Sequence, residues 1–129
     1  NELGDFAGKK VPGIAPLVFN TRARYGSTSG LSAEITIEHI GSYYANDANT
    51  AEVSFYLILH GSMGYAFRVG KFDMHALIGV NNLTDQHYIA SSFINPATRT
   101  ADGKPLSPAF IEPGLPANAF ASLNIRTEL

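Results

Sequence analysis

The chain has no cysteine, no tryptophan and few charged residues. Without cysteine, neither a disulfide framework nor thiolate chemistry is available to it. Charged residues make up 16% of its 129 residues, well below the roughly 25% typical of soluble domains. No stretch approaches the run of about 20 apolar residues that a membrane-spanning helix requires. The net charge is −2 and the basic residues are scattered, which argues against the clustered basic face of a nucleic-acid-binding protein.

Apolar residues are abundant, at 45%, and in several segments they occupy every second position. Such alternation indicates a β-strand with one apolar and one polar side. The alternating segments run from about nine to sixteen residues, whereas strands of soluble proteins usually have about five or six. The five predicted strands are residues 17–25, 31–44, 53–68, 72–80 and 119–129.

The connections between these segments alternate between short and long. Residues 26–30 and 69–71 are short turns, whereas the loop around residues 45–50 and the proline-rich residues 91–117 are longer. Residues 1–16, before the first strand, also read as a loop. Short turns at one rim and long loops at the other are typical of outer-membrane barrels, whose tilted strands need about 9 to 11 residues to cross. The sequence therefore predicts an all-β fold of antiparallel up-and-down strands forming part of a large transmembrane β-barrel.

Two motifs at the ends of alternating segments are more specific than the alternation itself. Together, in this order and at this strand spacing, they resemble the closing part of TonB-dependent outer-membrane receptors. The resemblance covers nearly the whole chain, although Thr84 stands where an aromatic is common and the chain ends on Leu129 instead of an aromatic residue. The motif residues are Gly41, Ser42, Tyr43 and Tyr44 with Asp47 and Asn49, and then Asn81, Asn82 and Leu83 with Asp85 and Tyr88.

The resemblance implies a barrel of about 22 strands with a plugged lumen in a bacterial outer membrane. It implies energy-coupled uptake of a scarce nutrient, such as an iron–siderophore complex or cobalamin, with no enzymatic activity and no cofactor. The implied partners are outer-membrane lipid, a plug domain, the remaining barrel strands, an inner-membrane energy-coupling complex and the nutrient. The sequence holds neither a plug nor the segment that contacts that complex. It opens at Asn1 without a leader peptide, so we expect a piece of a longer receptor.

If the polar sides of the strands face a wet lumen, their charged residues are candidates for lining the pore or for contacting the plug or the ligand. Glu34 and Glu38 share one side of a predicted strand, but four residues of strand separate two carboxylates by about 13 Å, beyond the spacing that glycosidases use for a catalytic pair. The candidates on the strands are Arg22, Arg24, Glu34, Glu38, His60, Arg68 and His75, and those in the last loop are Arg99, Asp102 and Lys104.

The sequence predicts no metal site. Its four histidines are at least twelve residues apart and lack zinc-site spacing. His60 and His75 could be neighbours on adjacent strands, but we favour two solvated lumen histidines. Asp47, together with Asn46 and Asn49, could ligate calcium, yet this loop lacks the spacing and the glutamate of an EF-hand.

A different class of protein remains open, a soluble all-β binding module similar to a lipocalin. It would enclose Leu57, Leu59 and Met63 in a ligand cavity, whereas the barrel hypothesis turns them outward to lipid. The barrel hypothesis also expects His39, on the apolar side, to lie near the outer interface. Because five strands cannot close a barrel, residues 17–25 and 119–129 are expected to form open edges.

Overall fold

The computed structural model describes residues 7–94, 98–99, 102, 105–106 and 109–127. These residues form strands and turns without any helix, which confirms the all-β prediction. No helix in this part of the chain has the length and apolarity that would span a membrane. The chain divides into two compact units. The sheet unit comprises Phe19–Glu38, Leu57–Gln86 and Leu115–Leu129, and the loop unit comprises Asn1–Val18, His39–Tyr56 and His87–Gly114.

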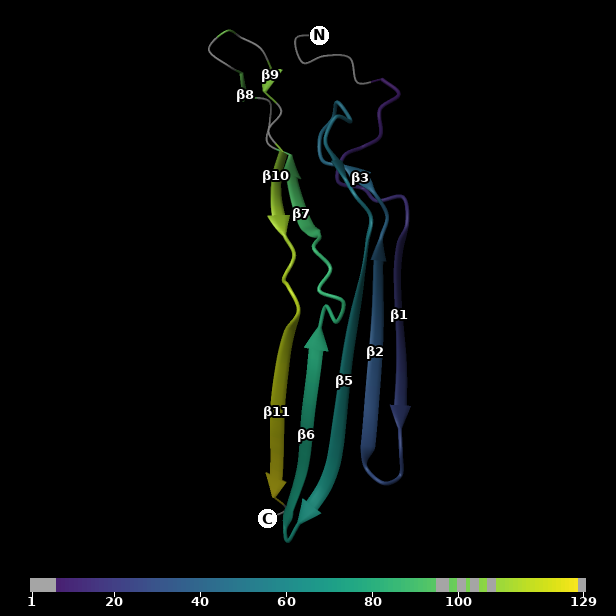
Figure 1. Ribbon diagram of the computed structural model, residues 1–129, viewed down its shortest axis with the longest axis vertical. Helices are drawn as coiled ribbons and strands as arrows, with labels where there is room; N and C mark the ends of the chain where they lie inside the picture. The colour runs from purple at the N-terminus through teal and green to yellow at the C-terminus, as the bar shows by residue number, and fades with distance from the viewer. Residues whose placement is uncertain (1–6, 95–97, 100–101, 103–104, 107–108, 128–129) are drawn as a thin grey trace. The chain divides into compact units, whose positions relative to one another are not determined.

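Five long strands form one antiparallel sheet, as predicted. The strand order β1-β2-β5-β6-β11 follows the order of these strands along the chain, so the sheet is an up-and-down meander (Figure 1). The strands have between 9 and 14 residues. Their bounds are Val18–Gly26 for β1, Leu31–Ile40 for β2, Tyr56–Val69 for β5, Phe72–Asn81 for β6 and Asn118–Thr127 for β11.

The alternation of each strand is in phase with that of its neighbours. Met63 stands opposite Ile78, which stands opposite Ala121 on the next strand. Asp73 lies five residues before Ile78, on the other side of the strand, and stands opposite Arg68 on β5 and Arg126 on β11. Because directly opposite residues of an antiparallel pair point to the same side, the sheet has one apolar face and one polar face.

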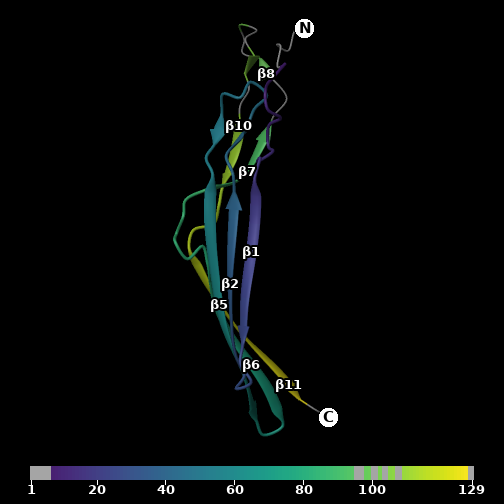
Figure 2. The same ribbon diagram turned by 90° about the vertical axis from the view of Figure 1, so that its right-hand side faces the viewer.

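The apolar face is exposed. Leu57 is 46% and Ile78 is 62% exposed, and the described residues bury only three apolar side chains, those of Ala45, Val53 and Ile58. Turned edge-on, the five strands overlap in one twisted layer (Figure 2). The large exposed side chains on this face are Phe19, Tyr25, Leu31, Ile35, Leu57, Met63, Tyr65, Val69, Phe72, Ile78, Leu123 and Ile125.

Both edges of the sheet are open. β1 and β11 stand at the two ends of the strand order, so within the described residues each of them pairs with one neighbouring strand of the sheet. The expectation of two open edges is therefore confirmed. The two short turns also fall where the sequence predicts them, and Gly30 closes the first with a φ of 91°, which glycine adopts at little cost.

The loop unit contains strands that the sequence did not predict as separate elements. The predicted strand 31–44 is wrong in its end, because β2 stops at Ile40 and Gly41 and Ser42 separate it from the next strand; the N–H of Gly41 donates to the carbonyl of Leu17 at 2.8 Å. β3 (Tyr43–Tyr44) then pairs with β4 (Glu52–Val53), and the backbone N–H of Ala45 donates to the carbonyl of Ala51 at 2.7 Å.

The proline-rich residues 91–117 are not one structureless loop. β7 (Ile89–Ile94) pairs with β10 (Ala109–Pro113), with an irregularity between Glu112 and Pro113. β8 (Thr98–Arg99) pairs with β9 (Pro105–Leu106). Proline does not stop these short ladders, because it lies at the end of a strand, where no backbone donor is required.

Candidate functional site

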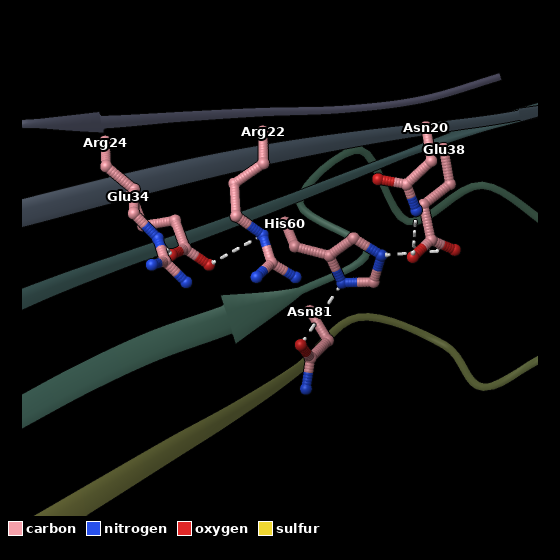
Figure 3. Close-up of polar contacts among 7 residues, drawn as sticks. All are labelled: Asn20, Arg22, Arg24, Glu34, Glu38, His60 and Asn81. Atoms are coloured by element: carbon pink, nitrogen blue, oxygen red, sulfur yellow. Dashed lines mark hydrogen bonds and ion pairs between the residues drawn. The ribbon is translucent and has the colours of Figure 1, made fainter.

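A row of polar side chains crosses the polar face of the sheet, with one residue from each of the five strands. Asn20 Nδ2 donates to Glu38 Oε1 at 3.4 Å, and Glu38 Oε2 lies 3.9 Å from His60 Nε2. His60 Nδ1 is 3.2 Å from Asn81 Oδ1, and Asn81 Nδ2 donates to Asn118 Oδ1 at 3.0 Å. Figure 3 shows the first four of these residues, and we call the five together the polar row.

Two arginines on β1 share one carboxylate on β2 beside this row. Arg22 Nε lies 3.4 Å from Glu34 Oε1, and Arg24 Nε pairs with Glu34 Oε2 (Figure 3). The arginine side chains are 52% and 67% exposed, so each pair is worth no more than about 1 kcal/mol. Glu34 and Glu38 thus have different partners, and they do not act as a carboxylate pair.

His60 is the least solvated titratable group of this site. Its Nε2 atom is buried and has no hydrogen-bond partner, although its side chain as a whole is 29% exposed. A small cavity of about 90 Å³ adjoins the ring. Its lining is completed by Glu34, Thr36, Gly61, Ser62, Asn81 and Phe120. The structure therefore brings together Arg22, Arg24, Glu34, Glu38 and His60 from the predicted lumen set.

Arg68 and His75 share the polar face but lie away from the polar row. Arg68 Nε is 3.3 Å from Asp73 Oδ1, next to the turn between β5 and β6. His75 stands opposite Ala66, which is six residues along β5 from His60, a distance of about 20 Å. The idea that His60 and His75 are cross-strand neighbours is therefore wrong. Within the described part of the chain, no three His, Asp or Glu residues gather as metal ligands.

The three candidates of the last loop are not seen as a cluster. Arg99 pairs with Pro105 through the β8–β9 ladder, but its side chain lies outside the described residues, as does the whole of Lys104. Asp102 is described and exposed. Their proposed contact with a ligand stays a prediction.

The first family motif forms a hydrogen-bonded clasp in the loop unit. Asn46 is 4% exposed, and its Oδ1 accepts the N–H groups of Thr50 and Ala51 at 2.9 and 3.1 Å. Asn49 adopts a φ of 56° and donates its N–H to the Asn46 carbonyl at 3.1 Å. The amide of Asn49 bonds both the N–H and the carbonyl of Lys10, at 2.7 and 2.9 Å. We call this arrangement the Asn46 clasp.

The second motif forms an equivalent clasp in the sheet unit. Asn82 is 2% exposed, and its Oδ1 accepts the N–H of Gln86 at 2.9 Å. Its Nδ2 donates to the carbonyls of Gln86 and Leu115, at 2.9 and 3.0 Å. Asp85 adopts a φ of 49°, donates its N–H to the Asn82 carbonyl at 2.9 Å, and accepts the N–H of Ala117 at 2.8 Å through Oδ1. This is the Asn82 clasp.

The two clasps share one design. In each, a buried asparagine accepts the N–H of the residue four positions later, and the residue three positions later adopts a left-handed backbone and reaches a remote segment. The side-chain oxygen of Asn46 accepts two backbone N–H groups and that of Asn49 accepts one, so both amides hold the loop together. Asp47, the remaining candidate ligand, is exposed.

The other motif residues position backbone and rings in the loop unit. The carbonyl of Tyr44 accepts the N–H of Gly13 at 2.7 Å, and the ring of Tyr44 lies 5.8 Å from Lys10 Nζ. Tyr88 packs against Tyr56 with ring centroids 4.7 Å apart and the ring planes tilted by 42°. A Cβ at Gly114 would lie 2.1 Å from the Tyr88 ring, so only glycine fits there. Tyr43 and Ser42 are half-buried.

Leu83 belongs to the second motif but lies on the sheet unit. Its N–H donates to the carbonyl of Leu59 at 2.7 Å, and a Cβ at Gly61 would lie 3.0 Å from Leu83 Cδ1. In the loop unit, His39 lies beside Phe55 with ring centroids 6.0 Å apart, and its expected place near the outer interface stays a prediction.

Sequence reasoning missed Asn20 and Asn118, the two ends of the polar row. Their position on the polar side of an alternating strand was visible, but nothing in their spacing showed that five strands align there. The recurrence of asparagine three residues before Asn49 or Asp85 was the signal for the clasps. No protein-family model matches the sequence.

Proposed function

We propose that this chain is a section of the barrel wall of a TonB-dependent outer-membrane receptor. The observation that supports this best is the sorting of side chains on one sheet. Large apolar side chains of all five strands are exposed on one face, and the polar row and its ion pairs lie on the other. A lipid-facing outer surface and a wet inner surface need this arrangement, because lipid-facing and lumen-facing residues alternate along barrel strands.

Strand length and open edges agree with this proposal. The sheet strands of 9 to 14 residues are long enough to cross a bilayer, for which about 9 to 11 tilted residues suffice. A barrel wall continues on both sides, so a section of it ends in strands with one unpaired edge, like β1 and β11. The exposed edges would pair with the remaining strands of the barrel.

Within such a receptor, the polar face would meet the plug domain or line the route of the nutrient. Arg22, Arg24, Glu34, Glu38 and His60 would form that contact surface. The energy for uptake would come from the inner-membrane complex acting on the N-terminal part of the receptor. An iron–siderophore complex or cobalamin is the class of cargo that the resemblance implies, and the chain would act on it by binding, with no enzymatic step.

The soluble lipocalin-like module is the less supported alternative. It requires Leu57 and Met63 to line an enclosed cavity, whereas both are about half exposed on one open sheet face. Exposed apolar surfaces of this extent mark sites of contact with lipid or with another protein.

The test is the partition of the chain into lipid vesicles, measured by flotation, with a pair of adjacent substitutions on β11. Ala121→Arg places a charge on the apolar face, and Ser122→Arg places the same charge on the polar face of the same exposed edge strand. A charge on the lipid face near the bilayer centre costs about 2–4 kcal/mol, so Ala121→Arg should reduce the bound fraction by at least about tenfold.

Ser122→Arg serves as the control and should leave the bound fraction unchanged. Equal partition of the two variants would contradict the proposed orientation of the faces. A chain that stays monomeric in plain buffer, unfolds cooperatively on heating and does not bind vesicles would support the soluble module instead.

A further inference from the structure

The hydrogen bonds of Asn118 and Asn81 in the polar row determine that Nδ1 of His60 carries a proton. Asn118 Nδ2 donates to the carbonyl of Pro116 at 2.9 Å, and a carbonyl can only accept. The oxygen of Asn118 therefore faces Asn81 and accepts from its Nδ2. That leaves Asn81 Oδ1 facing His60 Nδ1, so Nδ1 must carry a proton.

The second nitrogen of this ring faces a carboxylate. A protonated His60 forms an ion pair with Glu38, whose Oε2 lies 3.9 Å from Nε2, whereas the neutral ring presents the lone pair of Nε2 to that carboxylate (Figure 3). Two electron-rich atoms then face each other, and Nε2 is buried without a hydrogen bond. A cation between the two atoms would satisfy both.

We propose that His60 Nε2 and Glu38 form a binding site for a divalent transition-metal ion, with zinc as its simplest probe. Zinc binds histidine nitrogen and carboxylate oxygen at about 2.0–2.2 Å, so a tetrahedral ion holds such atoms about 3.4 Å apart. The observed 3.9 Å closes to this value with a shift of about half an ångström in Glu38, whose side chain is 46% exposed. Water completes the coordination from the open polar face.

The partner of Nδ1 supports a metal ligand more than a simple polar contact. Histidines that bind metals usually donate their other ring N–H to a carbonyl or carboxylate oxygen, which fixes the tautomer and orients the ring. Asn81 Oδ1 fills that role here, and its own orientation is held by Asn118. His60 Nε2 is therefore oriented toward the proposed site before an ion binds.

The charges around the site favour a cation at this carboxylate. Arg22 and Arg24 from β1 are engaged with Glu34, whereas the partners of Glu38 within the described residues are Asn20 and His60. The groups facing His60 from β2 include Glu34 and Thr36, and β6 contributes Asn81. All of these residues belong to the sheet unit, so the proposed ion site does not depend on the place of the chain in a membrane.

The experiment is calorimetric titration of zinc chloride into the full chain, folded in detergent micelles and checked by circular dichroism. We expect one ion per chain. His60→Gln and Glu38→Gln should each abolish saturable binding. Asn81→Leu should weaken it by about tenfold or more, because it removes the partner that orients the ring.

His75→Gln is the matched control, since this histidine lies on the same face about 20 Å away and should leave binding unchanged. The nitrogen NMR signals of His60 provide a second readout: Nδ1 should be protonated and Nε2 bare without zinc, and the Nε2 signal should move on its addition. Absence of saturable binding, equal binding by His60→Gln as for an adventitious ion only, or an Nε2-protonated neutral ring would each overturn the proposal.

Discussion

Replacement of Asn82 separates what its hydrogen bonds contribute from what its backbone conformation costs. The side chain makes three hydrogen bonds to backbone groups, two to Gln86 and one to Leu115, at 2.9–3.0 Å from a site that is 2% exposed. Each is worth about 1 kcal/mol net, so Asn82→Gly should lower the free energy of unfolding by about 3 kcal/mol. Glycine accepts the observed φ of 52° without strain.

Asn82→Ala loses the same bonds and must also hold a left-handed backbone, which costs alanine about 1–2 kcal/mol more. Asn82→Asp keeps the acceptor for the N–H of Gln86 but turns a second oxygen toward two carbonyls, so it should be at least as destabilised as glycine. Thr84→Ala, an exposed position in the same turn, is the control and should change little.

The assay is urea unfolding of the chain in detergent micelles, followed by circular dichroism, with hydrogen exchange at the start of β11 as a local readout. The order of stability should be wild type, then glycine, then alanine. An Asn82→Gly variant as stable as the wild type would show that the clasp does not hold residues 115–117 in place. A glycine variant less stable than the alanine variant would refute the claim that the left-handed backbone at residue 82 destabilises alanine relative to glycine.

Two further substitutions test packing and charge on the polar face. Gly79→Val places a Cβ 2.4 Å from the Phe120 ring and should cost about 1–3 kcal/mol in unfolding free energy, most of which Phe120→Ala should restore in the double variant; a fully additive pair of losses would exclude this contact. Arg24→Ala should lower the unfolding free energy by less than about 1 kcal/mol and lose its effect in high salt, because the pair with Glu34 is largely exposed; a loss well above that value would contradict the assignment.

The strands of the sheet could be predicted from the sequence because each alternates over nine or more residues. Period two identified β1, β5 and β6 to within a few residues, and turn chemistry located the turn at Gly30. The end of β2 could not be predicted, because the apolar residues Tyr43 and Tyr44 follow the interruption at Gly41 and Ser42 and pair with β4 instead. That pairing with a later segment is a contact that no local pattern reveals.

The polar row could be predicted only in part. Alternation placed Glu38 and His60 on the polar side, but the alignment of five strands depends on register, and a change of two residues in one pair would leave every pattern intact. The pattern therefore allowed His75 to lie beside His60, whereas the register sets it beside Ala66. The clasps were recognisable as motifs, whereas their remote partners at Lys10 and Leu115 were not.

The borders of the sheet select partners by backbone geometry. Along β1 and β11, the outward N–H and C=O groups repeat at a fixed spacing that the backbone of any extended chain can match. Growth of the sheet at either border therefore leaves both faces as they are, and the polar row and the Asn82 clasp would be carried unchanged into a wider sheet. Any strand that adds there must itself alternate in the same phase, or its charges would fall among the exposed leucines and isoleucines.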